Sequence, residues 1–352
     1  MKKPSNPKKI LLSIIIILVI ISSMYLLYFF WPHSTGTTWY TSDPILSSDE
    51  DYPTTTVAVK DPSVLFFEDK WHVFFSGIFI NDEGVYERTI NYVSSERLED
   101  LNSKPRFQIT PFSENTQRTA APCVFFFEPQ QKWYLVAQAL YEDPYTPIFS
   151  TTSTISNPSS WSEVKPLVNK TGTDKWIDFW VICDEESAYL FYTSDHHAMH
   201  YMKTAIEDFP KGLSGPYIAE GDILVHEACM VYKVKDEQEY CLITEGRYQF
   251  NKREFFISRS NSIEGPWTPS TLLVTGNDLI FENEKWSGVV SHGEFIRSGY
   301  DQKMEISSTS KIELLFQGVP SMNLNYDENH WQLGITRNFQ DETEGIIYKN
   351  EN

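Results

Sequence analysis

Three acidic side chains stand at comparable places in a sequence pattern that recurs along the chain. Asp61 opens the first copy of the pattern, Asp178 opens the third and Glu227 the fourth. Carboxylates gathered around a water-filled funnel suit glycoside hydrolysis, because one can protonate the leaving oxygen while another activates water. A third carboxylate can raise the pKa of the acid, since a neighbouring negative charge disfavours ionisation. The three positions therefore predict a sugar-cleaving site, and the competing interpretation is that each acid caps a turn.

Each copy of the pattern consists of two runs of β-branched and aromatic residues separated by a short polar turn, which is typical of a β-hairpin. The turns fall at residues 68–70, 128–131 and 184–187, and the fifth copy begins at His292. About five units of roughly 50 to 65 residues predict an all-β, five-bladed β-propeller. The first strand of every blade lines the central channel, so the three acids should converge, and His292 should point into the same channel.

Other chemistries have weaker support in the sequence. His196, His197 and His200 resemble a metal cluster only loosely, and a polar loop explains them equally well. The sequence contains no G-x-S-x-G, no glycine-rich phosphate loop and no Cys-x-x-Cys.

An apolar run at residues 10–31 follows four lysines near the N-terminus. Its length of about 22 residues is sufficient to cross a bilayer, and the lysines place the rest of the chain outside the cytosol. We therefore expect a transmembrane anchor (1–32), a stalk and lead-in (33–58), a propeller (59–340) and a C-terminal tail (341–352). The expected location is a single-pass membrane protein with an extracellular or lumenal catalytic domain. A cleaved signal peptide, and hence a secreted protein, is the alternative.

Charge and cysteine content narrow the range of partners. The formal net charge of −19 at pH 7 argues against binding to nucleic acid and leaves a neutral polymer as an acceptable partner. A hairpin turning near residues 235–238 would place Cys229 opposite Thr244 and Cys241 opposite Tyr232, with the two thiols on opposite faces of the sheet. We therefore expect buried free thiols.

The chain resembles glycoside hydrolase family 62, the α-L-arabinofuranosidases that remove arabinose side chains from arabinoxylan. The resemblance covers nearly the whole exterior domain. Its most specific segment is Trp-Ile-Asp-Phe-Trp-Val-Ile-Cys-Asp, and the matching segments lie at residues 59–62, 120–122, 176–184, 291–294 and 316–318.

The resemblance implies a five-bladed propeller that inverts the anomeric carbon, with Asp61 as general base and Glu227 as general acid. It also implies that Asp178 tunes the acid and contacts the sugar, and that His292 lies near a structural calcium ion. The sugar contacts that it suggests are Lys60, Trp176, Arg247 and Arg253. The sequence does not decide which of the two arginines lines the substrate groove.

Together these features predict a monomeric arabinofuranosidase that acts on arabinoxylan and uses no organic cofactor. Its rivals are a related propeller glycosidase acting on arabinan or β-xylosides, and a noncatalytic glycan-binding propeller. The residue beside the proposed acid is His226, and strand alternation predicts that its ring points away from Glu227.

Overall fold

The computed structural model describes residues 16–17, 22, 34–48, 56–81, 83–114, 118–139, 145–169, 174–248, 252–323 and 326–340. The chain divides into a unit at Met1–Ser34 and a second unit at Thr35–Asn352. Most of the predicted anchor at residues 10–31 lies outside the described residues, of which only Ile16, Ile17 and Ser22 fall within it, in helical conformation. No helix within the described ranges combines the length and apolar character that a membrane span needs. The anchor therefore stays a prediction from sequence.

The second unit is an all-β, five-bladed propeller, as the repeats predicted. Blade 1 contains β2 (Thr56–Phe67), β3 (Lys70–Ile80), β4 (Tyr86–Ser95) and β5 (Phe107–Gln108). Blade 2 contains β6 (Thr119–Phe127), β7 (Lys132–Ala139), β8 (Thr146–Thr152) and β9 (Lys165–Pro166). Blade 3 contains β10 (Trp176–Cys183), β11 (Ser187–Ser194), β12 (Ala198–Ala205) and β13 (Ser214–Ile218).

Blade 4 contains β14 (Glu227–Val234), β15 (Tyr240–Tyr248), β16 (Lys252–Ser260) and β17 (Thr271–Val274), with β20 (Glu305–Ile306) added beside β14. Blade 5 contains β19 (Val289–Phe295), β21 (Glu313–Val319), β22 (Gln332–Arg337), β1 (Trp39–Thr41) and β18 (Leu279–Phe281). Within the described residues, four short helical segments lie in the connections: η1 (Leu98–Ser103), α2 (Thr110–Glu114), η2 (Glu128–Gln130) and η4 (Tyr326–Glu328).

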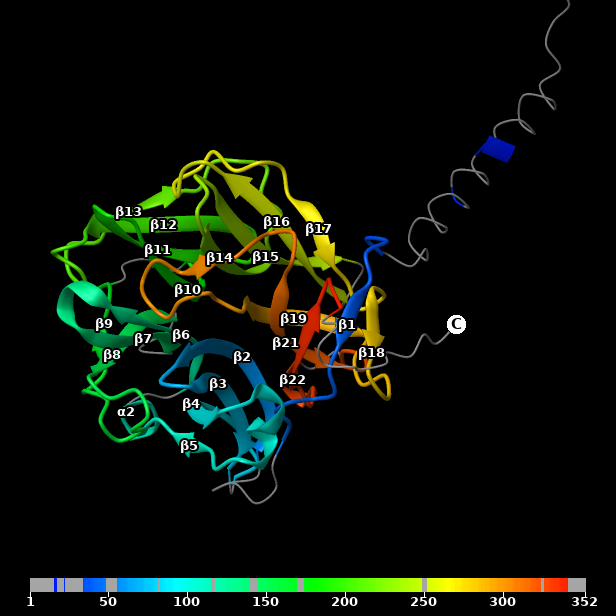
Figure 1. Cartoon of the computed structure of the whole chain (residues 1–352), viewed down its shortest axis with the longest axis horizontal. Helices are drawn as coiled ribbons and strands as arrows, with labels where there is room; N and C mark the ends of the chain where they lie inside the picture. Colours follow the sequence, from blue (N-terminus) through cyan, green and yellow to red (C-terminus); the bar gives the residue numbers. More distant parts are fainter. Residues whose placement is uncertain are drawn as a thin grey trace, which may run out of the picture. The chain divides into compact units, whose positions relative to one another are not determined.

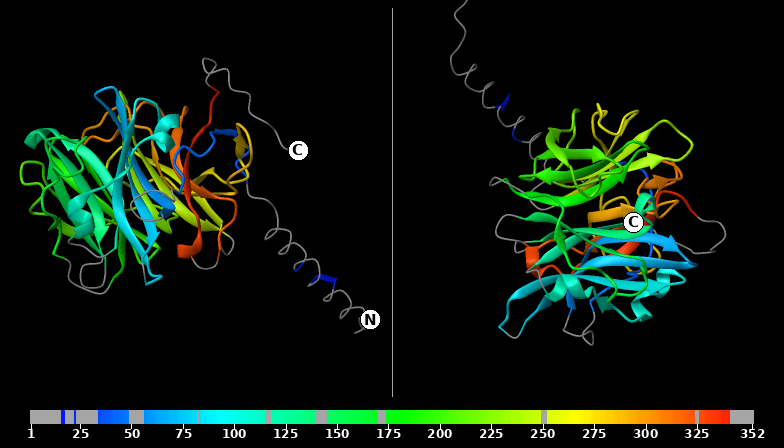
Figure 2. Two further views of the ribbon diagram at one scale, coloured as in Figure 1. Left: turned by 90° about the horizontal axis from the view of Figure 1, so that it is seen from below. Right: turned by 90° about the vertical axis from the view of Figure 1, so that its left-hand side faces the viewer.

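The last blade joins the two ends of the propeller sequence. Strand β1 pairs with β22 on one side and with β18 on the other, and Figures 1 and 2 show this blue strand among the red and yellow strands. Trp39 in β1 is buried. Part of the segment predicted as stalk and lead-in is therefore a propeller strand, which links the start of the repeats to their end.

The inner strands β2, β6, β10, β14 and β19 surround the central channel (Figure 1), and each contacts the inner strand of the following blade. Each inner strand carries a β-bulge near its start. The bulges begin at Asp61, Ala121, Asp178, Ala228 and His292, and all but the last of these residues have a positive φ. A bulge re-aims side chains that regular alternation would send to opposite faces.

The bulges correct one sequence prediction. Asp61 and Asp178 occupy equivalent positions, but the equivalent residue of blade 4 is Ala228, and Glu227 lies one residue earlier. The three acids therefore do not share one repeat position. They still reach the same cavity, because both residues at the start of a bulge can face the channel.

The backbone N–H of each bulge residue is satisfied by a side chain from the preceding blade. For four of the five bulges, the acceptor side chain lies on the second strand of the preceding blade. There it pairs with the residue that comes just before that preceding blade's own bulge. Gln317 accepts from Asp61 at 2.8 Å, Ser76 from Ala121 at 2.9 Å, Gln138 from Asp178 at 2.9 Å and Glu245 from His292 at 2.6 Å. In blade 4 the carboxylate of Asp178 itself accepts from Ala228, at 2.9 Å. These bonds tie neighbouring blades together and hold the strand starts in place.

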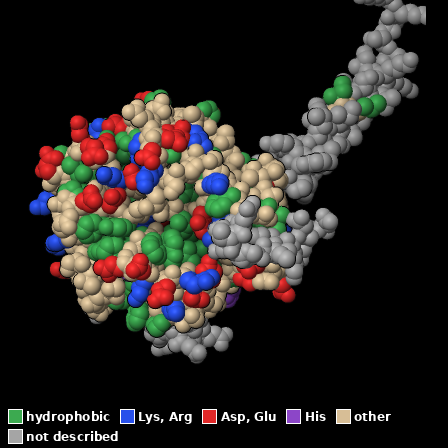
Figure 3. Space-filling view, viewed as in Figure 1, with side chains coloured by type: hydrophobic (Ala, Val, Ile, Leu, Met, Phe, Trp, Pro, Cys, Tyr) green, Lys and Arg blue, Asp and Glu red, His purple; other side chains and the backbone are tan. Residues whose placement is uncertain are grey.

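The described propeller has a large apolar core, and its cysteines are part of it. Cys123, Cys183, Cys229 and Cys241 are all buried and free. Cys229 pairs with Thr244, and Cys241 pairs with Tyr232, which confirms the predicted register and the expectation of free thiols. On the face in Figure 3, acidic and basic side chains alternate around a central group of hydrophobic ones. The negative net charge is thus not gathered into a single acidic patch on that face.

Candidate active site

One cavity of about 550 Å³ lies where the inner strands begin. It brings together the three predicted carboxylates, Asp61, Asp178 and Glu227. Its basic lining consists of Lys60, Arg88, Arg118, Lys175, Arg247 and Arg253, together with His196, His226 and His292. A cavity in which cations surround three acids can bind a polar ligand and hold individual carboxylates in different protonation states.

Asp61 is buried and ionises easily. Burial alone would raise the pKa of this carboxyl, but Lys60 and His292 outweigh that effect and lower it below the ordinary value. The Nζ of Lys60 lies 3.6 Å from Oδ1 of Asp61, and Nδ1 of His292 lies 3.7 Å from the same oxygen. An ionised carboxylate facing a cavity is what a general base requires.

Asp178 has the opposite tendency. Burial raises the pKa of its carboxyl, the negative charges of Glu227 and Asp61 add to that effect, and His292 only partly opposes it. One oxygen, Oδ2, accepts the N–H of Ala228 at 2.9 Å and lies 3.8 Å from Nδ1 of His292. Asp178 thus connects the inner strands of blades 3, 4 and 5.

Glu227 is held ionised in the free site. Burial would raise its pKa, but Arg253 and His196 outweigh burial and hold the pKa well below the ordinary value. Arg253 contacts the carboxylates of both Glu227 and Glu245 through the same nitrogen. The sequence predicted that a third carboxylate would raise the pKa of Glu227, whereas here the cations dominate.

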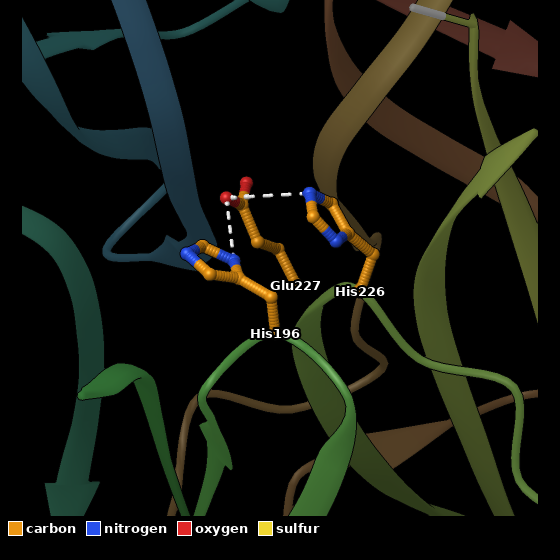
Figure 4. Close-up of side chains that lie close together, drawn as sticks. All are labelled: His196, His226 and Glu227. Atoms are coloured by element: carbon orange, nitrogen blue, oxygen red, sulfur yellow. Dashed lines mark ion pairs between the residues drawn. The ribbon is translucent and has the colours of Figure 1, made fainter. Parts of the chain in front are cut away.

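Two histidines approach Glu227 from different segments (Figure 4). His196 Nδ1 lies 3.2 Å from Oε1 of Glu227, and His226 Nε2 lies 3.9 Å from the same oxygen. The prediction that His226 points away from the acid is therefore wrong. His226 precedes the first residue of β14, so strand alternation does not govern its direction, and its ring stacks on His196 with centroids 4.8 Å apart. Burial lowers the pKa of His226 to about 4, so the ring is neutral near pH 7.

The four predicted sugar contacts have different positions. Lys60 and Arg253 are buried and line the cavity, and both lie over the ring of Tyr326, at 4.4 Å and 5.1 Å from its centroid. Arg247 also lines the cavity but is exposed. Trp176 is not among the lining residues, and its indole stacks against Tyr192 at 4.3 Å.

Sequence reasoning missed several groups at this site. Glu245 is fully buried and accepts from the Ser291 hydroxyl and the His292 amide, both at 2.6 Å. The sequence feature that could have identified Glu245 is its position in the second strand of the blade 4 hairpin, where it pairs with Glu227. Tyr326 comes from a short helical segment without a repeat counterpart, so no sequence signal pointed to it.

His292 was predicted to lie near a calcium ion, and its surroundings allow a partial test. Calcium takes six to eight oxygen ligands. The carboxylates of Asp61 and Asp178 both face Nδ1 of His292 and supply oxygens of the right chemistry. The small space of about 10 Å³ beside His292 is lined mainly by apolar residues such as Met230. The donor set fits a hard cation only if water completes its coordination.

Comparisons with known proteins identify the family. The chain is 28% identical over 291 residues to α-L-arabinofuranosidase C of Cellvibrio japonicus, and this match covers 80% of the chain but only 44% of that relative. A catalytic domain of a family 62 α-L-arabinofuranosidase from Coprinopsis cinerea superposes with a TM-score of 0.75 at 30% identity, covering 86% of this chain and 96% of that one.

Two further solved structures are similar. An α-L-arabinofuranosidase from Podospora anserina, in complex with cellotriose, matches at 28% identity and a TM-score of 0.75, covering 86% of this chain and 96% of that one. A family 62 hydrolase in complex with xylotriose matches at 27% identity and a TM-score of 0.76, covering 88% of this chain and 99% of that one. The profile of glycosyl hydrolase family 62 matches residues 54–337, which span nearly the whole propeller, and the chain therefore belongs to glycosyl hydrolase family 62.

Proposed function

We propose that this protein hydrolyses terminal α-L-arabinofuranosyl side chains of arabinoxylan. The main support is the cavity in which Asp61, Asp178 and Glu227 converge among cationic side chains. Family membership and the similarity to named arabinofuranosidases support the choice of sugar. The relative crystallised with xylotriose supports a xylan-type backbone as the neighbouring group.

The proposed mechanism is a single displacement. Asp61 accepts a proton from water as the water attacks the anomeric carbon, and its lowered pKa keeps it ionised for this purpose. Glu227 gives a proton to the departing xylose oxygen. The product sugar leaves with inverted configuration, because attack and departure occur on opposite faces of the ring.

Glu227 must be protonated when substrate is bound, although Arg253 and His196 favour its ionised form in the free site. Arg253 also contacts Glu245, so it keeps a carboxylate partner if a sugar displaces it from Glu227. We propose that substrate binding does displace it. Loss of this cation, together with exclusion of water, raises the pKa of a buried carboxyl.

Asp178 is proposed to tune Glu227 and to contact the sugar. Its charge raises the pKa of a neighbouring carboxyl once the cations have moved away, and the charge of Glu227 already raises the pKa of Asp178 in the free site. Lys60 and Arg253 are the proposed sugar contacts, because both are buried at the cavity wall. Arg247 is proposed to contact the polymer nearer the opening.

The test uses the full chain in detergent with wheat arabinoxylan, linear arabinan and an aryl β-xyloside. We expect arabinose from arabinoxylan, and proton NMR at early times should show the β-anomer first because the substrate is α-linked. An initial α-anomer would contradict inversion. Release of xylose, or of arabinose from arabinan alone, would favour the related propeller glycosidase. Glycan binding without any release would favour the noncatalytic propeller.

We further propose a structural calcium ion near His292, with the carboxylate of Asp178 and water as its oxygen ligands. When bound, such an ion would hold Asp178 in place beside the inner strand of blade 5. The readout is the thermal unfolding midpoint after removal of divalent ions with a chelator, followed by titration with Ca²⁺. A rise in the midpoint that Asp178→Asn abolishes supports the ion, and an unchanged midpoint contradicts it.

Location and assembly are also proposals. The apolar run at residues 10–31 supports a membrane anchor with the propeller outside the cytosol. Expressed with its natural N-terminus, the protein should stay in the membrane pellet after carbonate extraction. A soluble product that begins after Trp31 would establish secretion instead. A monomer is expected, and light scattering of the detergent-solubilised chain measures this directly.

A further inference from the structure

Three potential metal ligands converge at the edge of the cavity. His196, His226 and Glu227 each offer one ligand atom, and these atoms all lie within 4.8 Å of one another. The individual distances to Oε1 are 3.2 Å from His196 and 3.9 Å from His226. Figure 4 shows the two rings on either side of the carboxylate, each with a nitrogen aimed at the same oxygen.

These ligands come from two blades. His196 lies in the turn between β11 and β12 of blade 3 and has a positive φ of 61°. His226 and Glu227 lie at the start of β14 in blade 4, where the N–H of His226 donates to the carbonyl of Glu245 at 2.7 Å. The turn and the strand start are thus both fixed by the backbone, and the rings stack with an interplanar angle of 25°. The arrangement is built before any ion arrives.

The spacing suits a tetrahedral site. Zinc binds imidazole nitrogen and carboxylate oxygen at about 2.0 to 2.2 Å, so neighbouring ligand atoms of a tetrahedral site lie about 3.4 Å apart. The observed 3.2 Å and 3.9 Å to Oε1 lie on either side of that value, and the ligand atoms of the two histidines lie within 4.8 Å of each other. Two imidazoles and one carboxylate leave a fourth position for water.

The donor atoms also point toward one place. Arg253 contacts Oε2 of Glu227, so Oε1 is the oxygen that faces the two imidazole rings. The Nδ1 of His196 is buried and faces Oε1 of Glu227 at 3.2 Å. A divalent ion between these two atoms would replace that direct contact with two metal–ligand bonds.

We propose that His196, His226 and Glu227 form a binding site for a divalent cation of zinc type. Two imidazoles select a borderline metal rather than calcium or magnesium, which prefer oxygen ligands. The nearby cations oppose a very tight site. Lys175 Nζ lies 3.1 Å from Nε2 of His196, and this exposed lysine must turn away when the metal binds. We therefore expect micromolar affinity.

Occupancy would stop glycoside hydrolysis, because a metal on Oε1 prevents Glu227 from carrying the proton that it must donate. This consequence rests on the proposed function, whereas metal binding itself does not. The ion would thus act as a reversible inhibitor that competes with protonation of the acid, and a chelator would restore activity.

The test measures metal binding directly on the full chain after treatment with a chelator and removal of the chelator. Zn²⁺ is titrated in competition with a chromogenic zinc indicator, in the presence of excess Ca²⁺ to occupy any oxygen-rich site. We expect one zinc per chain, with affinity at least tenfold weaker in His196→Gln and in His226→Gln. The matched control is His197→Gln, which removes the adjacent histidine of the same turn and should leave the affinity unchanged.

A second measurement uses the unsubstituted chain, so its result does not depend on whether the variants fold. Co²⁺ bound to the unsubstituted chain should give the intense visible absorption of a tetrahedral site, and Zn²⁺ should bleach it. The proposal is overturned if the unsubstituted chain binds no stoichiometric zinc, or if both histidine variants bind zinc as tightly as it does. A chain that binds zinc but releases no sugar even after the zinc has been removed would contradict the proposed function alone, and an active chain without zinc binding would contradict this inference alone.

Discussion

Lys60 and Asp61 are neighbours in sequence, yet both side chains line the same cavity, with Nζ of the lysine 3.6 Å from Oδ1 of the aspartate. In a regular strand they would point to opposite faces. The bulge that begins at Asp61, where φ is 48°, removes this separation. A buried carboxylate thereby receives a buried cation from the preceding residue.

Removal of this cation should change the pH dependence of activity. The folded-state pKa of Asp61 lies below its ordinary value, so the base stays ionised, and activity persists, as the pH falls through the ordinary carboxyl range. Without the lysine, burial dominates and the pKa rises. Lys60→Met should therefore move the acidic limb of the kcat/KM profile upward by about one pH unit or more.

The control for this prediction is Lys70→Met, which removes an exposed lysine at the start of β3. The same linkage applies to stability. The contribution of Asp61 is present above its unfolded pKa and is lost as the pH falls through the folded value. An acidic limb that does not move in Lys60→Met would show that the lysine does not set the ionisation of the base.

Asp61→Asn should lower kcat about 10³-fold, because an amide cannot accept the proton of the attacking water. Glycan binding, measured by calorimetry with arabinoxylan fragments, should stay within a fewfold of the original. The matched control is Asp69→Asn, an exposed residue of the β2–β3 turn with φ of 58°, which asparagine adopts readily. Near-normal turnover in Asp61→Asn would remove Asp61 from the mechanism.

Arg253→Met should destabilise the propeller by about 3 to 5 kcal/mol, because it leaves the carboxylates of Glu227 and Glu245 buried without their cation. Denaturant unfolding at pH 7 measures this loss. The deficit should shrink at low pH, where both carboxyls can be protonated. Lys252→Met, an exposed neighbour in β16, is the control and should change stability little. If Arg253→Met were as stable as the original protein, the two ion pairs would make no net contribution to the free energy of unfolding.

The four cysteines should be unreactive in the native state. All are buried, and burial raises the pKa of Cys123 and Cys241 to about 12, so neither forms thiolate near pH 8. A thiol-specific chromogenic reagent should detect no fast-reacting thiol in the folded protein and four after denaturation. Fewer than four under denaturing, nonreducing conditions would reveal a disulfide.

Sequence alone determined the architecture of the propeller, because hairpins with alternating apolar residues recur at a regular interval and must stack to bury their faces. It also predicted that Asp61, Asp178 and Glu227 converge, and the structure places all three in one cavity. The sequence also placed Cys229 and Cys241 on opposite faces, because strand register follows from turn position. These conclusions depend on local periodicity, which is visible in a linear chain.

Only the tertiary structure determined which charged side chains of the site contact one another. The bulges place Glu227 one residue before the position that Asp61 and Asp178 share, and they allow it to reach the same cavity. Arg253 and His196 hold the proposed acid ionised in the free site, a balance between burial and charge that residue types do not reveal. His226 faces Glu227 because it lies just outside the strand, where alternation no longer applies. Side-chain direction at strand starts and the charges contributed by neighbouring blades are set by long-range packing, so no local pattern encodes them.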